Sequence, residues 1–281
     1  MVILHNLRSF CIIRLNVQSF YAIMGGVCNT KPELLERMFQ LKITADLHCH
    51  TIASGHAYST AEEVIRAAAA AELEAVAITD HGPNLQKLLP EWYFSNMRVF
   101  PKKAHGVEIF RGIEANIIDD AGTLDAGPDM LKNLNFVIAS CHMPTISGPD
   151  AGYFTAACVG AMRNPIVNVM GHPDDGRMPV NYPELVRAAA ETNTLLELNN
   201  HSLSPLAPRL NAPENLREML RHCRKQGVPV VVSSDAHISF SVGSFGHSLA
   251  LIKEMEFPKE LVANTSLEKL KGLLKLKGWK G

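Results

Sequence analysis

Hydrophobic residues along this chain recur in short, nearly continuous runs. From residue 43 onward, the runs rich in β-branched and apolar residues are 43–47, 75–79, 109–113, 136–140, 166–170, 195–198 and 228–233. Short continuous runs of this kind are typical of strands that are buried on both faces, as in a parallel sheet. The pattern therefore predicts seven buried parallel strands.

Helix signals occur between several of these runs. Thr60 followed by Glu63 has the spacing of a capping box, and an alanine-rich stretch comes next. Proline is favoured in the first turn of a helix, and Gly227 is placed to end one. The helices predicted from these signals cover 60–73, 183–192, 213–226 and a basic segment that starts with a capping box at 265.

Strands and helices that alternate in this way predict an α/β fold, a TIM-like barrel of seven β/α units with its active site at the C-terminal ends of the strands. A flat doubly wound sheet is the alternative, but no glycine-rich phosphate loop of either common type follows a strand. The connections 82–105 and 143–152 are expected to be long loops that shape the substrate site. We expect residues 41–281 to form one domain.

Residues 1–40 do not share this pattern. The first 30 residues contain no acidic side chain, and Arg8 and Arg14 interrupt their apolar segments. These segments are too short for a transmembrane helix and match a signal peptide poorly. We interpret 1–40 as a poorly ordered N-terminal extension that results from an upstream start codon.

Composition narrows the function mainly by exclusion. A net charge of −1 argues against general binding to nucleic acid, so we expect at most a short oligonucleotide as a partner of that class. The six cysteines form no CxxC pair and are scattered along the chain, which predicts reduced thiols in a cytoplasmic protein without a membrane partner. The oligomeric state is not encoded in these patterns.

Histidine carries the strongest chemical signal, since several of the twelve histidines fall where predicted strands end. The C-terminal strand ends of a β/α barrel meet at one mouth, so residues far apart in sequence converge there. The candidate metal ligands at or just after these ends are His48, His50, His56, His81, Glu114, His142, His172, Asp235 and His237. The i, i+2 spacing of His48 and His50 places both rings on one side of a strand, and Cys49 should point away as a packing residue.

Imidazole and carboxylate ligands without thiolate are typical of catalytic zinc, manganese or iron. One catalytic zinc uses about three protein ligands, so nine candidates predict two or three divalent ions, with Glu114 as a bridge. Asn199 and Asn200 are expected to contact substrate or to hold histidine ligands by hydrogen bonds. His201 is a candidate for lining the pocket, and the other histidines are interpreted as surface residues or as residues that contact the ligands from behind.

The motifs that carry these residues occur together in one known family. They are Asp46-Leu47-His48-Cys49-His50-Thr51, His56-Ala57-Tyr58-Ser59-Thr60, Ile78-Thr79-Asp80-His81-Gly82-Pro83, Asn96-Met97-Arg98, Gly112-Ile113-Glu114-Ala115-Asn116, Cys141-His142, Gly171-His172-Pro173 and Ser234-Asp235-Ala236-His237. Over about residues 43 to 270 the chain resembles the PHP (polymerase and histidinol phosphatase) superfamily, and within it the stand-alone YcdX-like phosphatases.

The resemblance implies a distorted seven-stranded barrel with a trinuclear metal centre. The ligand sets that it implies are His48, His50, Asp235 and bridging Glu114 for one ion; Glu114, His142 and His172 for the second; and His56, His81 and His237 for the third. Zinc is the expected metal, with manganese and iron as alternatives.

A bound divalent metal lowers the pKa of water and so supplies hydroxide at neutral pH. We therefore predict a phosphatase that cleaves phosphomonoesters of a small metabolite with a metal-activated hydroxide. Glu114 and Asp235 are the predicted catalytic carboxylates, and Arg98, whose planar fork suits phosphate, is the predicted clamp.

Three other functions stay open. A phosphodiesterase or 3′–5′ exonuclease would act on short nucleic-acid ends. An amidohydrolase barrel also begins with His-x-His, although many of those enzymes carry a bridging lysine at the end of strand four, where this chain has His142. A catalytically idle metal-binding or interaction module is disfavoured, because no ligand is missing.

Overall fold

A parallel sheet forms the centre of the computed structural model, which describes residues 41–87, 89–205 and 207–281. Its strands are β1 (Ala45–Asp46), β2 (Ala75–Ile78), β4 (Val107–Asn116), β5 (Phe136–Ser140), β6 (Val169–Met170), β7 (Leu195–Asn199) and β8 (Val230–Ser233). Neighbouring strands pair in the order β1-β2-β4-β5-β6-β7-β8, and all these pairs are parallel. A bridge between Cys49 and Ala236 joins the ends of β1 and β8, so the sheet is a nearly closed barrel. The predicted fold class is confirmed, and the flat-sheet alternative is wrong.

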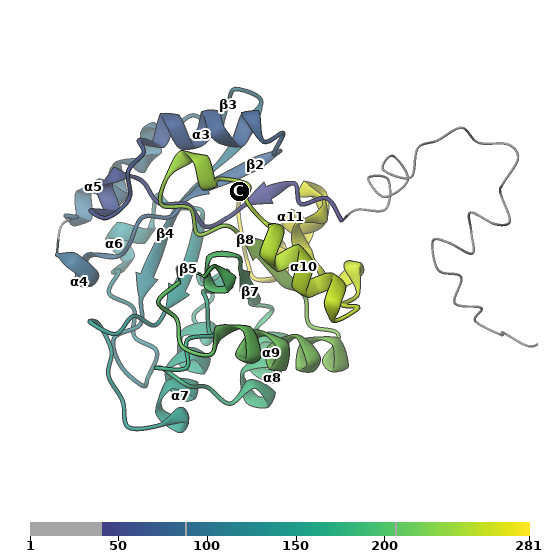
Figure 1. Cartoon of the computed structure of the whole chain (residues 1–281). Coiled ribbons are helices and arrows are strands. Elements are labelled where there is room, and N and C mark those ends of the chain that lie inside the picture. Colours follow the sequence, from purple (N-terminus) through teal and green to yellow (C-terminus); the bar gives the residue numbers. More distant parts are fainter. Residues whose placement is uncertain (1–40, 88, 206) are drawn as a thin grey trace, which may run out of the picture. The chain divides into compact units, whose positions relative to one another are not determined.

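Helices follow most of the strands and surround the sheet (Figure 1). The α-helices are α3 (Ala61–Ala70), α4 (Pro83–Gln86), α5 (Glu91–Ser95), α6 (Pro128–Leu131), α7 (Ala151–Arg163), α8 (Tyr182–Thr192), α9 (Ala212–Gln226), α10 (Gly246–Glu254) and α11 (Leu267–Leu276). Short 3-10 helices are η1 (Ile52–Ser54), η2 (Asn96–Val99), η3 (His201–Leu203), η4 (Ser239–Ser241), η5 (Lys259–Leu261) and η6 (Ala263–Thr265). The capping box at Thr60 and Glu63 is formed, and Gly227 ends α9 in the left-handed conformation.

Two of the sequence expectations about local structure are wrong. The segment 82–105 is not a plain loop, because it contains α4, α5, η2 and the short strand β3 (Lys103–Ala104), which pairs antiparallel with β4. Proline at the first turn of α4 favours helix there. The predicted start of the C-terminal helix, a capping box at Thr265, is also wrong. Ser266 caps this helix and accepts a hydrogen bond from the Lys269 backbone N–H, while the Thr265 hydroxyl donates to the Val262 carbonyl.

Strand residues alternate between two apolar clusters, as side chains on successive positions of a strand point to opposite faces. One cluster lies between strands and helices and includes Val76, Ile78 and Val232. The other contains Phe110 and Phe136, whose stacked rings lie 5.8 Å apart, together with side chains of α11.

Further along the strands, the side chains that share the face of this second cluster are polar. They are Glu114 and Asn116 on β4, Ser140 on β5, Glu197 and Asn199 on β7 and Ser233 on β8, all fully or almost fully buried. The barrel interior therefore changes from apolar to polar toward the C-terminal strand ends.

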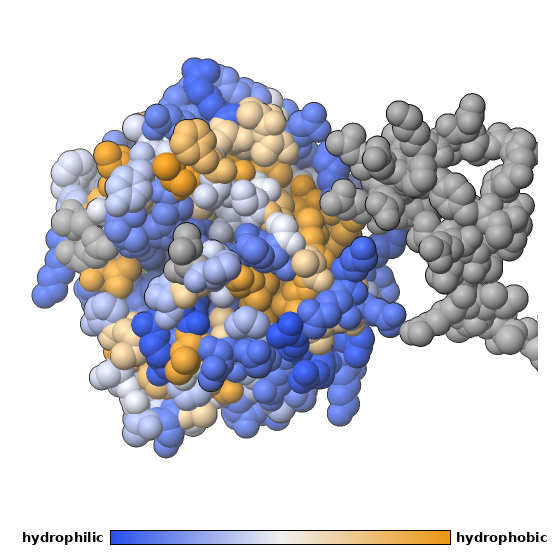
Figure 2. Space-filling model, viewed as in Figure 1, coloured by the Kyte–Doolittle hydropathy of each residue, from blue (hydrophilic) through white to orange (hydrophobic). Residues whose placement is uncertain are grey.

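The surface is mostly hydrophilic in the view of Figure 2, where hydrophobic residues appear in smaller groups. In the part of the chain that the structure describes, no helix has the length and apolar character needed to cross a membrane. Four cysteines in this part are buried free thiols: Cys49, Cys141, Cys158 and Cys223. The predicted N-terminal extension, residues 1–40, lies outside the described residues.

Candidate metal centre

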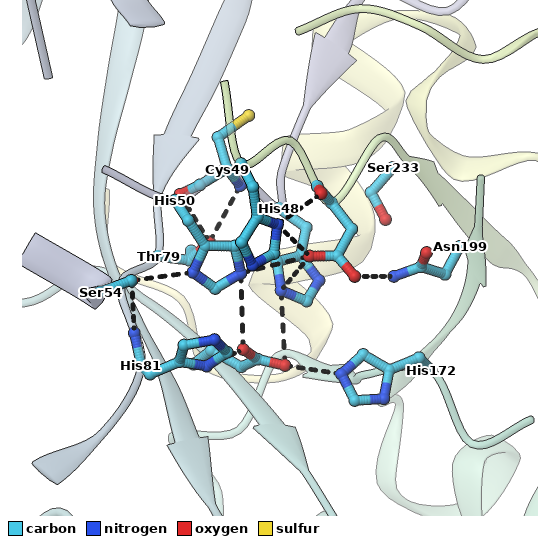
Figure 3. A network of polar contacts seen from close by, with 12 residues as sticks. His48, Cys49, His50, Ser54, Thr79, His81, His172, Asn199 and Ser233 are labelled. Carbon is cyan, nitrogen blue, oxygen red and sulfur yellow. Dashed lines mark hydrogen bonds and ion pairs between the residues drawn. The ribbon is translucent and has the colours of Figure 1, made fainter. Parts of the chain in front are cut away.

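Glu114 lies at the centre of the histidine cluster, near the C-terminal end of β4, and its side chain is inaccessible to solvent. Its carboxylate oxygens lie close to five imidazole nitrogens: His81 Nδ1 at 2.6 Å, His172 Nε2 at 2.8 Å, His48 Nε2 and His142 Nε2 at 3.4 Å, and His50 Nε2 at 3.6 Å. Figure 3 shows the rings of His48, His50, His81 and His172 directed toward this common space. The structure thus brings together residues at or just beyond the C-terminal ends of β1, β2, β4, β5 and β6, as the strand-end positions predicted.

The two oxygens of Asp235 have different partners. Oδ1 faces the ligand rings, 3.2 Å from His50 Nε2 and 3.6 Å from His48 Nε2. Oδ2 accepts hydrogen bonds from Arg209 Nη2 at 2.9 Å and from Asn199 Nδ2 at 3.1 Å. One oxygen is therefore held by Arg209 and Asn199, and the other faces the histidine rings.

Three histidines form the outer part of the cluster. His56 Nε2 lies 2.9 Å from His237 Nε2 and 3.4 Å from His81 Nε2. A neutral imidazole has one N–H donor and one acceptor nitrogen, so three nitrogens that converge in this way suit a shared cation. His201 lies beside this group, with its ring centre 6.2 Å from that of His237, and its role in lining the pocket stays a prediction.

Two of the predicted ligands have a backbone conformation that is uncommon for residues other than glycine. His172 has φ of 26° and Asp235 has φ of 55°. Left-handed backbone at non-glycine residues costs about 1–3 kcal/mol and often occurs at functional sites. The surrounding contacts hold both residues in this conformation, which directs their side chains into the cluster.

Two buried ring nitrogens at the centre, His48 Nε2 and His50 Nε2, have no hydrogen-bond partner within the described chain. His81 Nδ1 and Glu114 Oε2 make no hydrogen bond either, although they lie 2.6 Å from each other. A buried polar atom without a partner costs about 1–3 kcal/mol, so proteins rarely retain such atoms without a ligand for them. The opposite ring nitrogens of His48 and His50 do have partners, Glu197 at 2.7 Å and Ser54 at 3.1 Å. The residues present therefore fit divalent metal ions, which would bind the unpartnered nitrogens.

Three groups of side chains have ligand atoms within 4.8 Å of one another. They are His48, His50 and Asp235; His81, Glu114 and His142; and His50, His81 and His237. The first group lies within one of the expected ligand sets, and the other two combine residues from different sets. The division of the nine ligands among individual ions stays a prediction.

Charges in the cluster shift several pKa values. Burial alone would raise the pKa of Glu114, but the surrounding imidazoles, His48 foremost, lower it well below its usual range. Burial, with the neighbouring His81 and His237 rings, lowers the pKa of His50 well below its usual range. An ionised carboxylate and a neutral imidazole are the forms that bind metal ions. These two residues are therefore already in their metal-binding forms at neutral pH.

Sequence reasoning missed a layer of residues that holds the ligands. Glu197 accepts from His48 Nδ1, and Asn116 Oδ1 lies 2.8 Å from His142 Nδ1. Asp80 accepts hydrogen bonds from the Thr51 backbone and hydroxyl, the Ser54 hydroxyl and the Tyr93 hydroxyl, at 2.6–2.8 Å. Asp80 thereby fixes the loop between His50 and His56. Cys49 is fully buried in the apolar cluster between strands and helices, and its sulfur points away from the rings, as expected (Figure 3).

The two arginines of interest lie in different places. Arg98 is exposed on η2 and lines a surface hollow together with Trp92 and Lys132. Arg209 was not singled out from the sequence, yet it is the guanidinium in contact with a predicted ligand, Asp235, and it also donates to Ser202 Oγ at 2.7 Å. The role of Arg98 as a phosphate clamp stays a prediction.

Comparison with known proteins decides the family. Residues 46–203 match the family model described as the PHP domain, which is more than half of the chain. The chain belongs to the PHP family. A probable phosphatase of Acetivibrio thermocellus is 44% identical over 237 residues, which cover 84% of this chain and 97% of that protein. A probable phosphatase of Clostridium novyi is 38% identical over 238 residues, with 85% of this chain and 97% of that protein covered.

Two solved structures share the fold. Histidinol phosphate phosphatase of Lactococcus lactis, solved with zinc, L-histidinol and phosphate, aligns with a TM-score of 0.50 and 17% identity, over 76% of this chain and 94% of that chain. A chain in the structure of archaeal ribonuclease P with mature tRNA aligns with a TM-score of 0.52 and 14% identity, over 84% of this chain and 91% of that one. At such identities the likeness concerns the barrel alone.

Proposed function

We propose that this PHP protein is a metal-dependent phosphatase that hydrolyses phosphomonoesters of a small metabolite. The observation that carries the proposal is the convergence of seven histidines, Glu114 and Asp235, with unpartnered buried nitrogens, at the C-terminal end of the barrel. The names of the curated relatives, probable phosphatases, support the reaction class. The zinc and phosphate in the Lactococcus lactis phosphatase support the choice of metal and substrate class.

We expect two or three divalent ions, zinc foremost. His48, His50 and Asp235 would hold one ion, and Glu114 would bridge it to a second ion held with His142 and His172. His56, His81 and His237 would hold a third. When bound, divalent ions lower the pKa of water and offset the negative charge on phosphoryl oxygens.

The side chains around the ligands orient the site. Arg209 and Asn199 occupy Oδ2 of Asp235, so that only Oδ1 faces the ligand rings. A guanidinium has five N–H donors, and Arg209 uses two of them in its contacts with Asp235 and Ser202. We infer that a remaining donor of Arg209 binds a phosphoryl oxygen, with Arg98 as the second candidate.

The proposal is tested by hydrolysis of p-nitrophenyl phosphate beside its bis-ester, with metal content measured on the same sample. We expect monoester turnover that is lost with a chelator and falls at least about 100-fold in His142→Ala, which removes a ligand. His247→Ala, on the exposed face of α10, is the matched control and should retain turnover.

The other outcomes have defined meanings. A preference for the bis-ester would replace the phosphatase by a phosphodiesterase or 3′–5′ exonuclease. A metal-loaded protein that cleaves neither ester would point to amide substrates or to an idle metal-binding module.

A further inference from the structure

Glu197 is a buried carboxylate at the centre of the layer behind the metal ligands. Its side chain is almost inaccessible to solvent, and both of its oxygens have partners. Oε1 lies 2.7 Å from His48 Nδ1 and also accepts a hydrogen bond from the Ser233 hydroxyl. Oε2 accepts from the His172 backbone N–H at 2.6 Å and from Asn199 Nδ2 at 3.2 Å.

The two histidines that contact Glu197 belong to different ligand sets of the proposed function. Both rings direct Nε2 toward Glu114 Oε1, at 3.4 Å for His48 and 2.8 Å for His172, and His48 Nε2 also lies 3.6 Å from Asp235 Oδ1. Their rings are stacked, with centres 5.8 Å apart. In the proposed ligand sets, where Glu114 bridges the two ions, Glu197 therefore stands behind both ion positions at once.

Each contact of Glu197 fixes a different property of its ligand. The contact at His48 Nδ1 places the ring proton on that nitrogen and leaves Nε2 as the metal-binding atom. The contact at the His172 N–H holds a backbone whose φ is 26°, and so sets the direction of that ring. Through Asn199, which also donates to Asp235 Oδ2 at 3.1 Å, the same carboxylate reaches a third ligand.

We propose that Glu197 is a positioning residue that orders the ligands of two metal ions together, so that its loss weakens the binding of both. The inference rests on the proposed function only for the assignment of His48 and His172 to separate ions. A carboxylate that merely fills a space in the barrel would not need both oxygens committed to ligand residues. Partners of this kind change metal affinity by about 10–100-fold.

The test is stepwise zinc binding to metal-free protein, with bound ions counted by native mass spectrometry and affinities obtained by competition with a chromophoric chelator. Glu197→Gln keeps the size of the side chain but replaces one acceptor oxygen by an amide donor, so it cannot satisfy both histidines. We expect two binding steps to weaken, each about 10–100-fold. Asn116→Ala is the matched control, because Asn116 contacts one ligand ring, His142, and one step should weaken.

Weakening of one step alone in Glu197→Gln, or of none, would overturn the proposal. Circular dichroism of the metal-free variant checks its fold. If Glu197→Gln does not fold, Glu197→Asp, whose shorter side chain retains the charge, is expected to weaken the same two steps. If the parent protein hydrolyses no phosphomonoester but Glu197→Gln still weakens two zinc-binding steps, the proposed function is wrong and this inference is supported.

Discussion

At the scale of single residues, the site depends on side chains whose two ends have separate partners. Asp235 presents Oδ1 to the ligand rings and Oδ2 to Arg209, and His48 presents Nε2 to the cluster and Nδ1 to Glu197. These two candidate ligands are therefore held in place by the protein itself, which would reduce the conformational entropy that ion binding must overcome. The residues behind the ligands should consequently affect metal binding and turnover almost as strongly as the ligands.

Arg209 offers a direct test of this point. We expect Arg209→Gln to lower kcat/KM for p-nitrophenyl phosphate about 10–100-fold, because Asp235 Oδ2 loses its charged partner and the phosphoryl group loses a donor. Metal content, measured on the same samples, separates the two effects: a fall indicates lost positioning of Asp235, and a rise in KM at full metal content indicates lost phosphate binding.

Arg177 provides the control for Arg209. It lies in the neighbouring loop, partly exposed, and pairs with Asp175. Arg177→Gln should leave kcat/KM unchanged. Unchanged kcat/KM in Arg209→Gln as well would exclude Arg209 from the reaction, and a loss confined to Arg98→Gln would then favour Arg98 as the clamp.

The convergence of the candidate ligands could be predicted from sequence because most of them directly follow apolar runs, and the topology of a barrel brings strand ends together. Glu197 could have been found in the same way, since it shares the inward face of β7 with Leu195 and is the one charged residue of that strand. Arg209 could not, because its position depends on the path of the loop after η3, for which no periodic pattern exists.

At the scale of elements, the chain was predictable where local signals and tertiary pairing agree. The capping box of α3 and the glycine after α9 mark their ends correctly, since caps act within a few residues. Strand β6 is shorter than its apolar run, because Asn168 pairs with Val137 partly through its side chain: the Val137 N–H donates to Asn168 Oδ1 at 2.9 Å. A side-chain oxygen that accepts a hydrogen bond in place of a backbone carbonyl between two strands depends on the partner strand and leaves no pattern in the sequence.

The end of α11 contains a buried lysine that links this helix to α7. Lys277 is 7% exposed, its ammonium donates to the Met162 carbonyl, and burial lowers its pKa to about 8. The pKa of Lys277 is about 10.4 in the unfolded chain and about 8 in the folded chain. Burial of the charge therefore lowers the free energy of unfolding by its full amount below about pH 8, and this loss disappears as pH rises from about 8 to about 10. We therefore expect the stability lost at Lys277 to be recovered in alkaline solution.

The measurement is thermal unfolding of Lys277→Met and the parent protein between pH 7 and pH 9.5. At pH 7 the variant should be more stable by about 1 kcal/mol, or about 2–4 °C in Tm, with the difference narrowing toward pH 9.5. Lys275→Met, at an exposed position of the same helix, should show no pH-dependent difference. A difference that is constant with pH would mean that the buried charge is not its cause.

At the scale of the whole molecule, the candidate metal centre joins segments that are remote in sequence. The predicted ligands follow or end β1, β2, β4, β5, β6 and β8, so ions bound to them connect nearly the whole barrel. Without ions, the buried carboxylates Glu114, Glu197 and Asp235 and several unpartnered ring nitrogens remain at the centre. The loss of the connecting ions and the burial of these uncompensated polar groups should both lower the stability of the metal-free protein.

Removal of the metal should therefore lower Tm. An ion that binds the folded chain alone adds RT ln(1 + [L]/Kd), about 2.7 kcal/mol at a free concentration 100 times Kd, so a chelator should lower Tm by about 5–10 °C. The check is calorimetry before and after chelation, with ion loss confirmed by elemental analysis, and recovery of Tm when zinc is returned. Glu114→Gln weakens the central ligand and should make Tm nearly independent of the chelator. A Tm that stays constant while the ions leave would show that the barrel is complete without them, and that the ligands are held in place by residues such as Glu197, Asn116 and Asp80 alone.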